Sequence, residues 1–186
     1  MGAQDSPVTP ATNLYTNPTH AFSCKIPAGW VLRTDEMNAG TDGDKGQVLL
    51  AAFERPPDAA GDAVNSTILI ATENQSTYPG LKNPEDYFAP LTEIVTAQGF
   101  KVVNEPYVFP VSSKSLVRAD FARENAGAKN HVAAYQSTLV MLSHGAIISF
   151  TFIAGNEGDA DDLIENLTFL HSAKSRPKTA PEKKAK

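Results

Sequence analysis

The sequence predicts an α+β fold, a three-layer α/β/α sandwich around a mostly antiparallel sheet. Two observations predict this fold class. The segments expected to be strands in the second half carry apolar side chains on both faces, so neither face of their sheet can be left in water. Two further segments have apolar side chains at helical spacing, and each can cover one face of the sheet.

Strands are predicted from the alternation of polar and apolar residues. In the segment 22–26, Phe22, Cys24 and Ile26 share one face, which is the pattern of a half-buried strand. Further strands are predicted, in chain order, at 30–32, 47–53, 67–71, 101–105, 115–123, 131–142 and 146–154. Hairpin-like connections join the last three. With each turn centred in its connection, the numbers of paired residues sum to about 288 in the last hairpin and about 254 in the hairpin before it.

Helices are predicted in two places. The first spans 84–98, where Asn83 is a typical N-cap, Pro84 suits the first helical position and Gly99 ends the helix. Its apolar stripe consists of Tyr87, Phe88, Leu91, Ile94 and Val95. The second helix lies in the final segment, 159–170, where Leu163, Ile164 and Leu167 have helical spacing. We expect one helix on each face of the sheet.

Composition is that of an ordinary globular protein. The chain has 186 residues, of which 41% are hydrophobic and 20% charged, and no apolar run is long enough to cross a bilayer. A chain of this size fits one domain and can fold without a disulfide or a structural metal. We predict a single domain at 13–172, a disordered leader at 1–12 and a disordered basic tail at 173–186.

Charge is unevenly distributed along the chain. From residue 174 onward, six basic residues and one acid give +5, so the rest carries −10 of the total of −5. The basic residues are Lys174, Arg176, Lys178, Lys183, Lys184 and Lys186. An acidic body argues against a nucleic-acid surface, which would need a basic face. We interpret the tail as a solvated end, and contact with an anionic membrane surface is the alternative.

One stretch of sequence carries a resemblance to a known family. A short strand at Tyr15 and Asn17 precedes Phe22-Ser23-Cys24-Lys25-Ile26-Pro27-Ala28-Gly29-Trp30, and a helix, a long antiparallel meander and a last helix follow. This order and the pattern F-S-x-x-I-P-x-G-W resemble the PsbP-like fold superfamily over residues 13–171. In particular, the chain resembles bacterial exported, uncharacterised members such as the DcrB-like proteins. The resemblance implies the fold, and a function in binding partners rather than in turning over substrates.

The N-terminal residues bear on the compartment. No cationic stretch followed by an apolar run is present, so this numbering contains no signal peptide. Residues 3–6, Ala-Gln-Asp-Ser, nevertheless resemble the start of a mature chain after a small-residue cleavage site. Together with the family resemblance, this predicts an extracytoplasmic protein, periplasmic or secreted.

Nucleophilic and metal chemistry have little support in the sequence. Cys24 is the single cysteine and alternates with apolar residues, so we expect a buried side chain rather than a reactive thiol. No Gly-x-Ser-x-Gly elbow is present, and no two of the four histidines have a ligand spacing. The predicted register does place His131 opposite Glu157 and close to Asp159, a candidate metal site. The alternative is that these acids cap a helix and complement its dipole.

A polar set interrupts an otherwise apolar face of the sheet. The predicted register brings together Arg118, Asp120, Gln136 and Thr138. Because buried charges must be paired, an internal network is one interpretation. The other is the polar lining of a pocket between sheet and helix, where a few polar groups would orient a ligand.

Three functions remain open from sequence. The first is a non-catalytic, exported binding or assembly domain, which predicts an exposed apolar patch or groove. The second is a carrier of a small amphiphilic ligand, which predicts an enclosed pocket between a helix and the sheet. The third is a hydrolase without a recognisable motif, which needs a nucleophile and a base within hydrogen-bond reach. We expect a monomer without a cofactor, whose partner is another protein.

Overall fold

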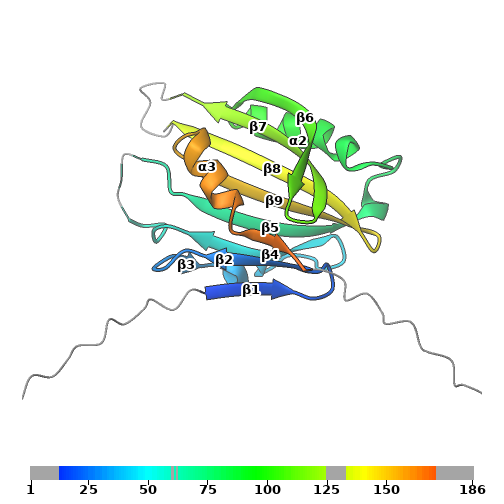
Figure 1. The fold of residues 1–186 in the computed structure, drawn as a ribbon, viewed down its shortest axis with the longest axis horizontal. Helices are drawn as coiled ribbons and strands as arrows, with labels where there is room; N and C mark the ends of the chain where they lie inside the picture. The colour runs from blue at the N-terminus through cyan, green and yellow to red at the C-terminus, as the bar shows by residue number, and fades with distance from the viewer. Residues whose placement is uncertain (1–12, 60, 62, 125–132, 171–186) are drawn as a thin grey trace, which may run out of the picture.

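A seven-stranded antiparallel sheet forms the centre of the molecule (Figure 1). The structure, a computed structural model, describes residues 13–59, 61, 63–124 and 133–170. The sheet has the strand order β3-β4-β5-β9-β8-β7-β6. Its strands are β3 (Val31–Leu32), β4 (Gly46–Phe53), β5 (Thr67–Asn74), β6 (Lys101–Val111), β7 (Lys114–Arg123), β8 (Ala134–Ser143) and β9 (Ala146–Ala154). The antiparallel sheet predicted from sequence is confirmed.

A second, smaller sheet was not predicted. It contains β1 (Asn13–Asn17), β2 (Phe22–Ile26) and β10 (Leu167–Phe169), in the order β1-β2-β10. The final segment therefore does not form one helix over 159–170. A helix, α3 (Glu157–Ile164), is followed by the short strand β10, in which buried Leu167 and Phe169 alternate with exposed Thr168. That alternation has the period of a strand, and pairing with β2 satisfies its backbone.

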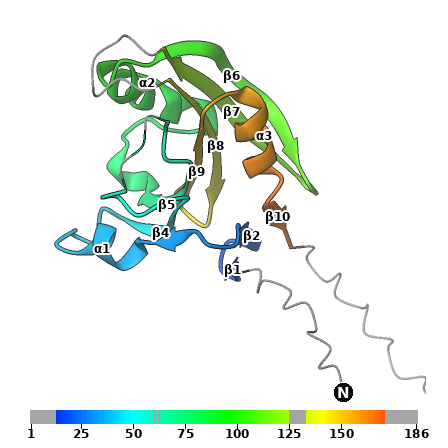
Figure 2. The same ribbon diagram turned by 90° about the vertical axis from the view of Figure 1, so that its left-hand side faces the viewer.

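The small sheet and α3 cover one face of the large sheet (Figure 2). Aromatic side chains from three strands meet in the space between them. The ring of Phe22 packs edge-on against Phe150 at a centroid distance of 5.0 Å, and Phe169 lies beside both. All three side chains are buried, as is Cys24. This layer forms the larger part of the core.

The other face of the large sheet is covered by α2 (Phe88–Ala97) and the 3-10 turn that precedes it, η2 (Pro84–Tyr87) (Figure 2). Asn83 and Asp86 form a capping box at the start, which confirms the predicted helix start. Phe88 and Val95 are buried against the sheet. Ile94, which was predicted to face the sheet, is instead 58% exposed on the outer side. The predicted three-layer arrangement is thus present, with β1, β2 and β10 added to the α3 layer.

Two short elements complete the described fold. They are the one-turn helix α1 (Thr34–Asn38), between β3 and β4, and the 3-10 turn η1 (Gln75–Thr77), after β5. Among the described residues, no helix has the length and apolar character needed to cross a membrane. The predicted leader at 1–12 and the whole of the predicted basic tail, 173–186, lie outside the described residues, as does His131.

The predicted hairpin registers are wrong by an odd number of residues. His144 and Gly145 both have positive φ, 52° and 76°, so they form a two-residue turn and Ser143 pairs with Ala146. The predicted centre on His144 would have paired Ser143 with Gly145. In the other hairpin, Val117 pairs with Val140 rather than with a residue three positions earlier. Because side chains alternate, each odd shift moves residues to the opposite face.

Candidate functional site

Arg118 and Asp120 lie together on the face of the large sheet that α3 covers. Both project from β7, where residues two apart share a face. Arg118 is 3% exposed and Asp120 is fully buried, and Arg118 Nε donates to Asp120 Oδ1 at 2.8 Å. The guanidinium also lies over the ring of Phe109, 4.7 Å from its centroid. Two opposite charges are therefore buried as a hydrogen-bonded pair.

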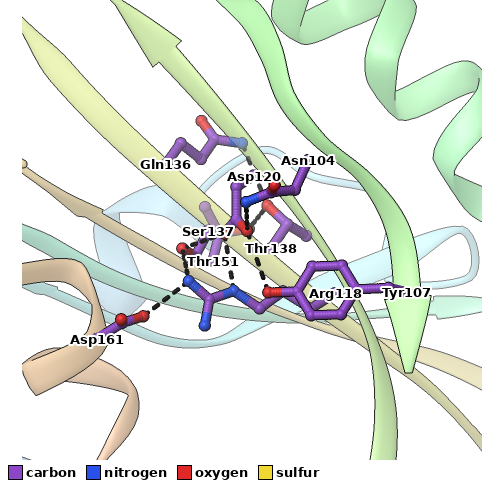
Figure 3. A network of polar contacts seen from close by, with 9 residues as sticks. All are labelled: Asn104, Tyr107, Arg118, Asp120, Gln136, Ser137, Thr138, Thr151 and Asp161. Carbon is purple, nitrogen blue, oxygen red and sulfur yellow. Dashed lines mark hydrogen bonds and ion pairs between the residues drawn. The ribbon is translucent and has the colours of Figure 1, made fainter. Parts of the chain in front are cut away.

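Further residues complete this network (Figure 3). Arg118 Nη2 donates to Ser137 Oγ at 3.0 Å and to Asp161 Oδ1 of α3 at 2.7 Å. Each Asp120 oxygen accepts two hydrogen bonds. Oδ1 accepts from Arg118 and Ser137, whereas Oδ2 accepts from Asn104 Nδ2 at 2.9 Å and from the Tyr107 hydroxyl at 3.3 Å. Both oxygens of the buried Asp120 carboxylate thus have their hydrogen-bonding capacity satisfied by donors of the protein.

The network shifts the ionisation of its members. Burial, followed by the negative charge of Asp120, raises the pKa of Tyr107 to about 12. Burial disfavours the charged form of Arg118, but hydrogen bonds to Asp120 and Asp161 outweigh it, and the pKa of Arg118 is raised. At neutral pH the arginine is therefore charged and the tyrosine is neutral, so the Tyr107 hydroxyl donates a hydrogen bond to the Asp120 carboxylate.

Gln136 and Thr138 lie on the opposite face, under α2. The register pairs Arg118 with Leu139, and Gln136 and Thr138 precede Leu139 by three residues and by one, so both point away from the arginine. There Gln136 Nε2 donates to Thr138 Oγ1 at 3.2 Å, and Thr138 Oγ1 lies 3.1 Å from Thr151 Oγ1 (Figure 3). The four residues expected to be neighbours therefore form two separate polar groups. The sheet lies between these groups.

Four members of the Arg118 network did not emerge from the sequence: Asn104, Tyr107, Ser137 and Asp161. Ser137 would have been found with the correct hairpin centre, since it then lies directly opposite Asp120. Asn104 and Tyr107 reach the network through two register irregularities in β6, for which sequence carries no clear signal. Asp161 arrives from α3 by tertiary packing, at a separation of 43 residues from Arg118.

An open groove of about 590 Å³ lies beside the network, between the end of the β6–β7 hairpin and the α3–β10 segment. Its walls include apolar side chains from both sides, namely Phe109, Val111, Ile164 and Leu167, and its rim includes the carboxylates of Asp161 and Glu165. Two residues belong to both features, because Phe109 stacks on Arg118 and Asp161 accepts a hydrogen bond from it. The buried network thus contacts both sides of this groove, which we call the α3 groove.

The candidate metal residues Glu157 and Asp159 lie in the first turn of α3. Asn156 caps this helix, because its Oδ1 accepts from the Asp159 backbone N–H at 3.0 Å, and its Nδ2 donates to Asp159 Oδ2 at 2.8 Å. His131, the third member of the predicted site, is not among the described residues. Within the part of the chain that the structure describes, no group of three His, Cys, Asp or Glu side chains is placed to hold a metal ion.

The structure brings His20 beside Ser143 and His144, which are far from it in the sequence. His20 Nδ1 lies 3.1 Å from Ser143 Oγ, which lies 3.2 Å from His144 Nδ1. Burial, then the proximity of His144 and Lys114, lowers the pKa of His20. A hydroxyl and a base are thus within hydrogen-bond reach, but no carboxylate among the described residues hydrogen-bonds to either imidazole. Cys24 is buried, and burial raises the pKa of its thiol to about 12.

The fold can be compared with solved structures. The solution structure of cyanobacterial PsbP (CyanoP) from Synechocystis sp. PCC 6803 is similar over 91% of this chain and 98% of its own, with a TM-score of 0.56 and 14% sequence identity. The chain has the PsbP-like fold. Other solved structures match this chain with lower TM-scores. No family model and no curated protein sequence matches the chain.

Two of the matches with lower TM-scores are bacterial proteins. LpqN of Mycobacterium tuberculosis, described as involved in cell envelope biogenesis, aligns over 90% of this chain and 88% of its own, with 14% identity and a TM-score of 0.44. PA94 of Pseudomonas aeruginosa, a protein of unknown function, aligns over 81% of this chain and 87% of its own, with 16% identity and a TM-score of 0.40. At these identities the likeness concerns the PsbP-like fold alone, and a fold does not determine an activity.

Proposed function

We propose that this protein is a non-catalytic, exported binding domain that engages a protein partner through the α3 groove. The observation that carries the proposal is that the groove is open to solvent and has apolar walls, yet its wall is held by a buried hydrogen-bonded network. A rigid, preformed apolar surface binds a partner without first losing conformational entropy. The groove therefore supports a binding function over the two alternatives.

The chemistry of the network favours binding over catalysis. A general base needs a carboxylate free to accept a proton, whereas Asp120 is fully buried and already accepts four hydrogen bonds. Its donors are in turn fixed by the same contacts. We therefore assign Arg118 and Asp120 a structural role, which is to hold the β6–β7 hairpin and α3 in place on either side of the groove.

The two alternatives have less support. A carrier of a small amphiphile needs space between α2 and the sheet, but Phe88, Val95 and Phe121 are buried in that interface and pack together there. A hydrolase could use Ser143 with His20 or His144 as base. A histidine base is usually oriented by a third group, and neither imidazole has a carboxylate partner in the described residues. An esterase screen of the Ser143→Ala protein tests this alternative. If the variant keeps any activity that the unaltered protein shows, Ser143 is not the nucleophile and the alternative is ruled out.

The exported location is the second part of the proposal. It rests on the resemblance of residues 22–30 to exported PsbP-like proteins, and the single cysteine, which is buried, is compatible with an oxidising compartment. Fractionation of the native host with an antibody against the protein tests this part. Recovery with cytoplasmic markers would contradict it.

Site-specific photo-crosslinking tests the binding site. We suggest placing the photoreactive residue benzoylphenylalanine at Thr168, an exposed position in the α3 groove, and at Thr96, an exposed position on α2 across the sheet. The expected result is a discrete protein adduct from position 168 that excess unlabelled protein competes away, with none from position 96. Absence of an adduct from position 168 and from a second groove position, Ser112, would contradict the proposal.

A further inference from the structure

We infer that the partner presents a cationic, amphiphilic segment to the α3 groove, with a Lys or Arg side chain on the carboxylates of Asp161 and Glu165. This inference rests on the proposed function and specifies the chemistry of the partner. It follows from three observations. The buried network has a net negative charge, Asp161 presents one carboxylate oxygen to the groove, and the groove has apolar walls beside that oxygen.

The first step is the charge balance of the network. One guanidinium, that of Arg118, is shared between two carboxylates, those of Asp120 and Asp161, so the three groups carry a net charge of −1. Asp120 is fully buried and is surrounded by donors, whereas the side chain of Asp161 is 50% exposed. The uncompensated negative charge is therefore accessible from the groove, at Asp161.

The second step is the orientation of the two carboxylates. Arg118 fixes Asp161 Oδ1 at 2.7 Å, and no hydrogen bond joins Asp161 Oδ2 to any of the described residues. A carboxylate with one oxygen anchored and the other open is an acceptor already held in place for an incoming donor. Glu165 lies one helical turn further on and lines the same groove. Together they offer two carboxylates to a single bound segment.

The third step is that no cation among the described residues fills this role. The residues that line the groove include no Lys, Arg or His. Lys114 is near one end of the hairpin, but its ammonium lies 5.5 Å from the ring centroid of Phe169 and close enough to His20 to lower the pKa of that residue. Its charge therefore lies towards the β1–β2 connection. An anionic segment would meet only carboxylates in the groove.

The walls select the kind of cation. Apolar surface in the groove comes mainly from Phe109, which is partly exposed, and from Pro110, which is exposed, because Ile164 and Leu167 are buried beneath it. A Lys or Arg side chain buries its methylene stem on such a surface and keeps its charged end in contact with carboxylate and water. A metal ion gains nothing from apolar walls. A peptide segment that alternates apolar and basic residues satisfies both features, and the open shape of the groove admits a chain.

Short peptides provide a direct test with the full-length protein. The probes are acetyl-Leu-Lys-Leu-Lys-Leu-amide and its counterparts with Gln or Glu in place of Lys, titrated into ¹⁵N-labelled protein and followed by amide chemical shifts. We expect the Lys peptide to shift the amides of Phe109, Ser112, Ile164 and Thr168, and the Glu peptide to leave them unchanged. Glu165→Gln should weaken binding of the Lys peptide by about two- to five-fold, as for an exposed charge contact.

Controls separate this inference from the proposed function. Glu93→Gln makes the same charge change on the exposed side of α2 and should leave the affinity unchanged. Asp161→Asn is a second variant in the groove, accepted only if its amide spectrum remains folded. If the Gln peptide binds the groove as tightly as the Lys peptide and Glu165→Gln has no effect, the cationic specificity is overturned while the binding groove stands. If no peptide shifts the groove amides, both the inference and the groove as binding site are overturned.

Discussion

Replacing Arg118 by Met should destabilise the protein by roughly 3 kcal/mol, the lower end of the range for breaking a buried ion pair. Methionine keeps much of the apolar contact with Phe109, so the loss is mainly electrostatic. The carboxylate of Asp120 is fully buried and would lose its charged partner. Three donors remain to it, from Ser137, Asn104 and Tyr107, which is why we expect the lower end of the range.

Urea unfolding followed by circular dichroism measures this effect. The midpoint should fall while the slope with denaturant stays constant, because the surface exposed on unfolding is unchanged. Arg33→Met is the matched control, since Arg33 also pairs with a carboxylate, that of Glu36, but both side chains are partly exposed. That variant should lose less than about 1 kcal/mol.

A double-variant cycle isolates the pair. Asp120→Leu leaves Arg118 with Asp161 and Ser137, and the combined Arg118→Met/Asp120→Leu protein removes both buried charges at once. Because no unpaired charge is then left inside, the double variant should be more stable than the sum of the single losses predicts. If Arg118→Met costs no more than Arg33→Met, or if the two losses add, the reasoning that this network holds the groove wall is refuted.

Three further outcomes are expected. The Tyr135 hydroxyl is buried without a hydrogen-bond partner among the described residues. Tyr135→Phe should therefore leave the stability unchanged or raise it by up to about 1 kcal/mol in thermal unfolding, and a clear loss of stability would show that the hydroxyl does have a partner. Burial, His144 and Lys114 lower the pKa of His20 below its usual 6.5, so the unfolded chain binds more protons below pH 6.5. Stability should therefore be complete above pH 6.5 and fall as the pH drops, and His20→Gln should flatten that slope; an unchanged slope would assign it to other groups. Burial raises the pKa of Cys24 to about 12, so Ellman's reagent at pH 8 should modify it only after unfolding, and fast modification of the native protein would contradict its burial.

The elements that sequence predicted well are those with local signals. The start of the α2 segment follows from Asn83 and Pro84, and the strands follow from alternation of apolar residues. The second helix was extended too far because Leu167 fits helical spacing after Leu163 and Ile164. The same leucine also fits a strand, and only pairing with β2 decides between the two.

The site was harder to predict than the fold because its geometry depends on register. Arg118 and Asp120 are two apart on one strand, so their common face follows from local structure alone. Their partners depend on where the hairpin turns. The register of β7 against β8 differs by three residues from the predicted one, which places Ser137 rather than Ala134 opposite Asp120. The contribution of Asp161 depends on how α3 docks, which no local pattern specifies.

The measurement that tests binding at the α3 groove most directly is the mass of the adduct formed at position 168 in the native host. Mass spectrometry of the crosslinked protein should show the chain joined to another polypeptide, with the attached peptide containing Lys or Arg beside apolar residues. An adduct that forms equally from position 96, or no adduct from either groove position while the protein is folded, would contradict the assignment of this groove as a binding site.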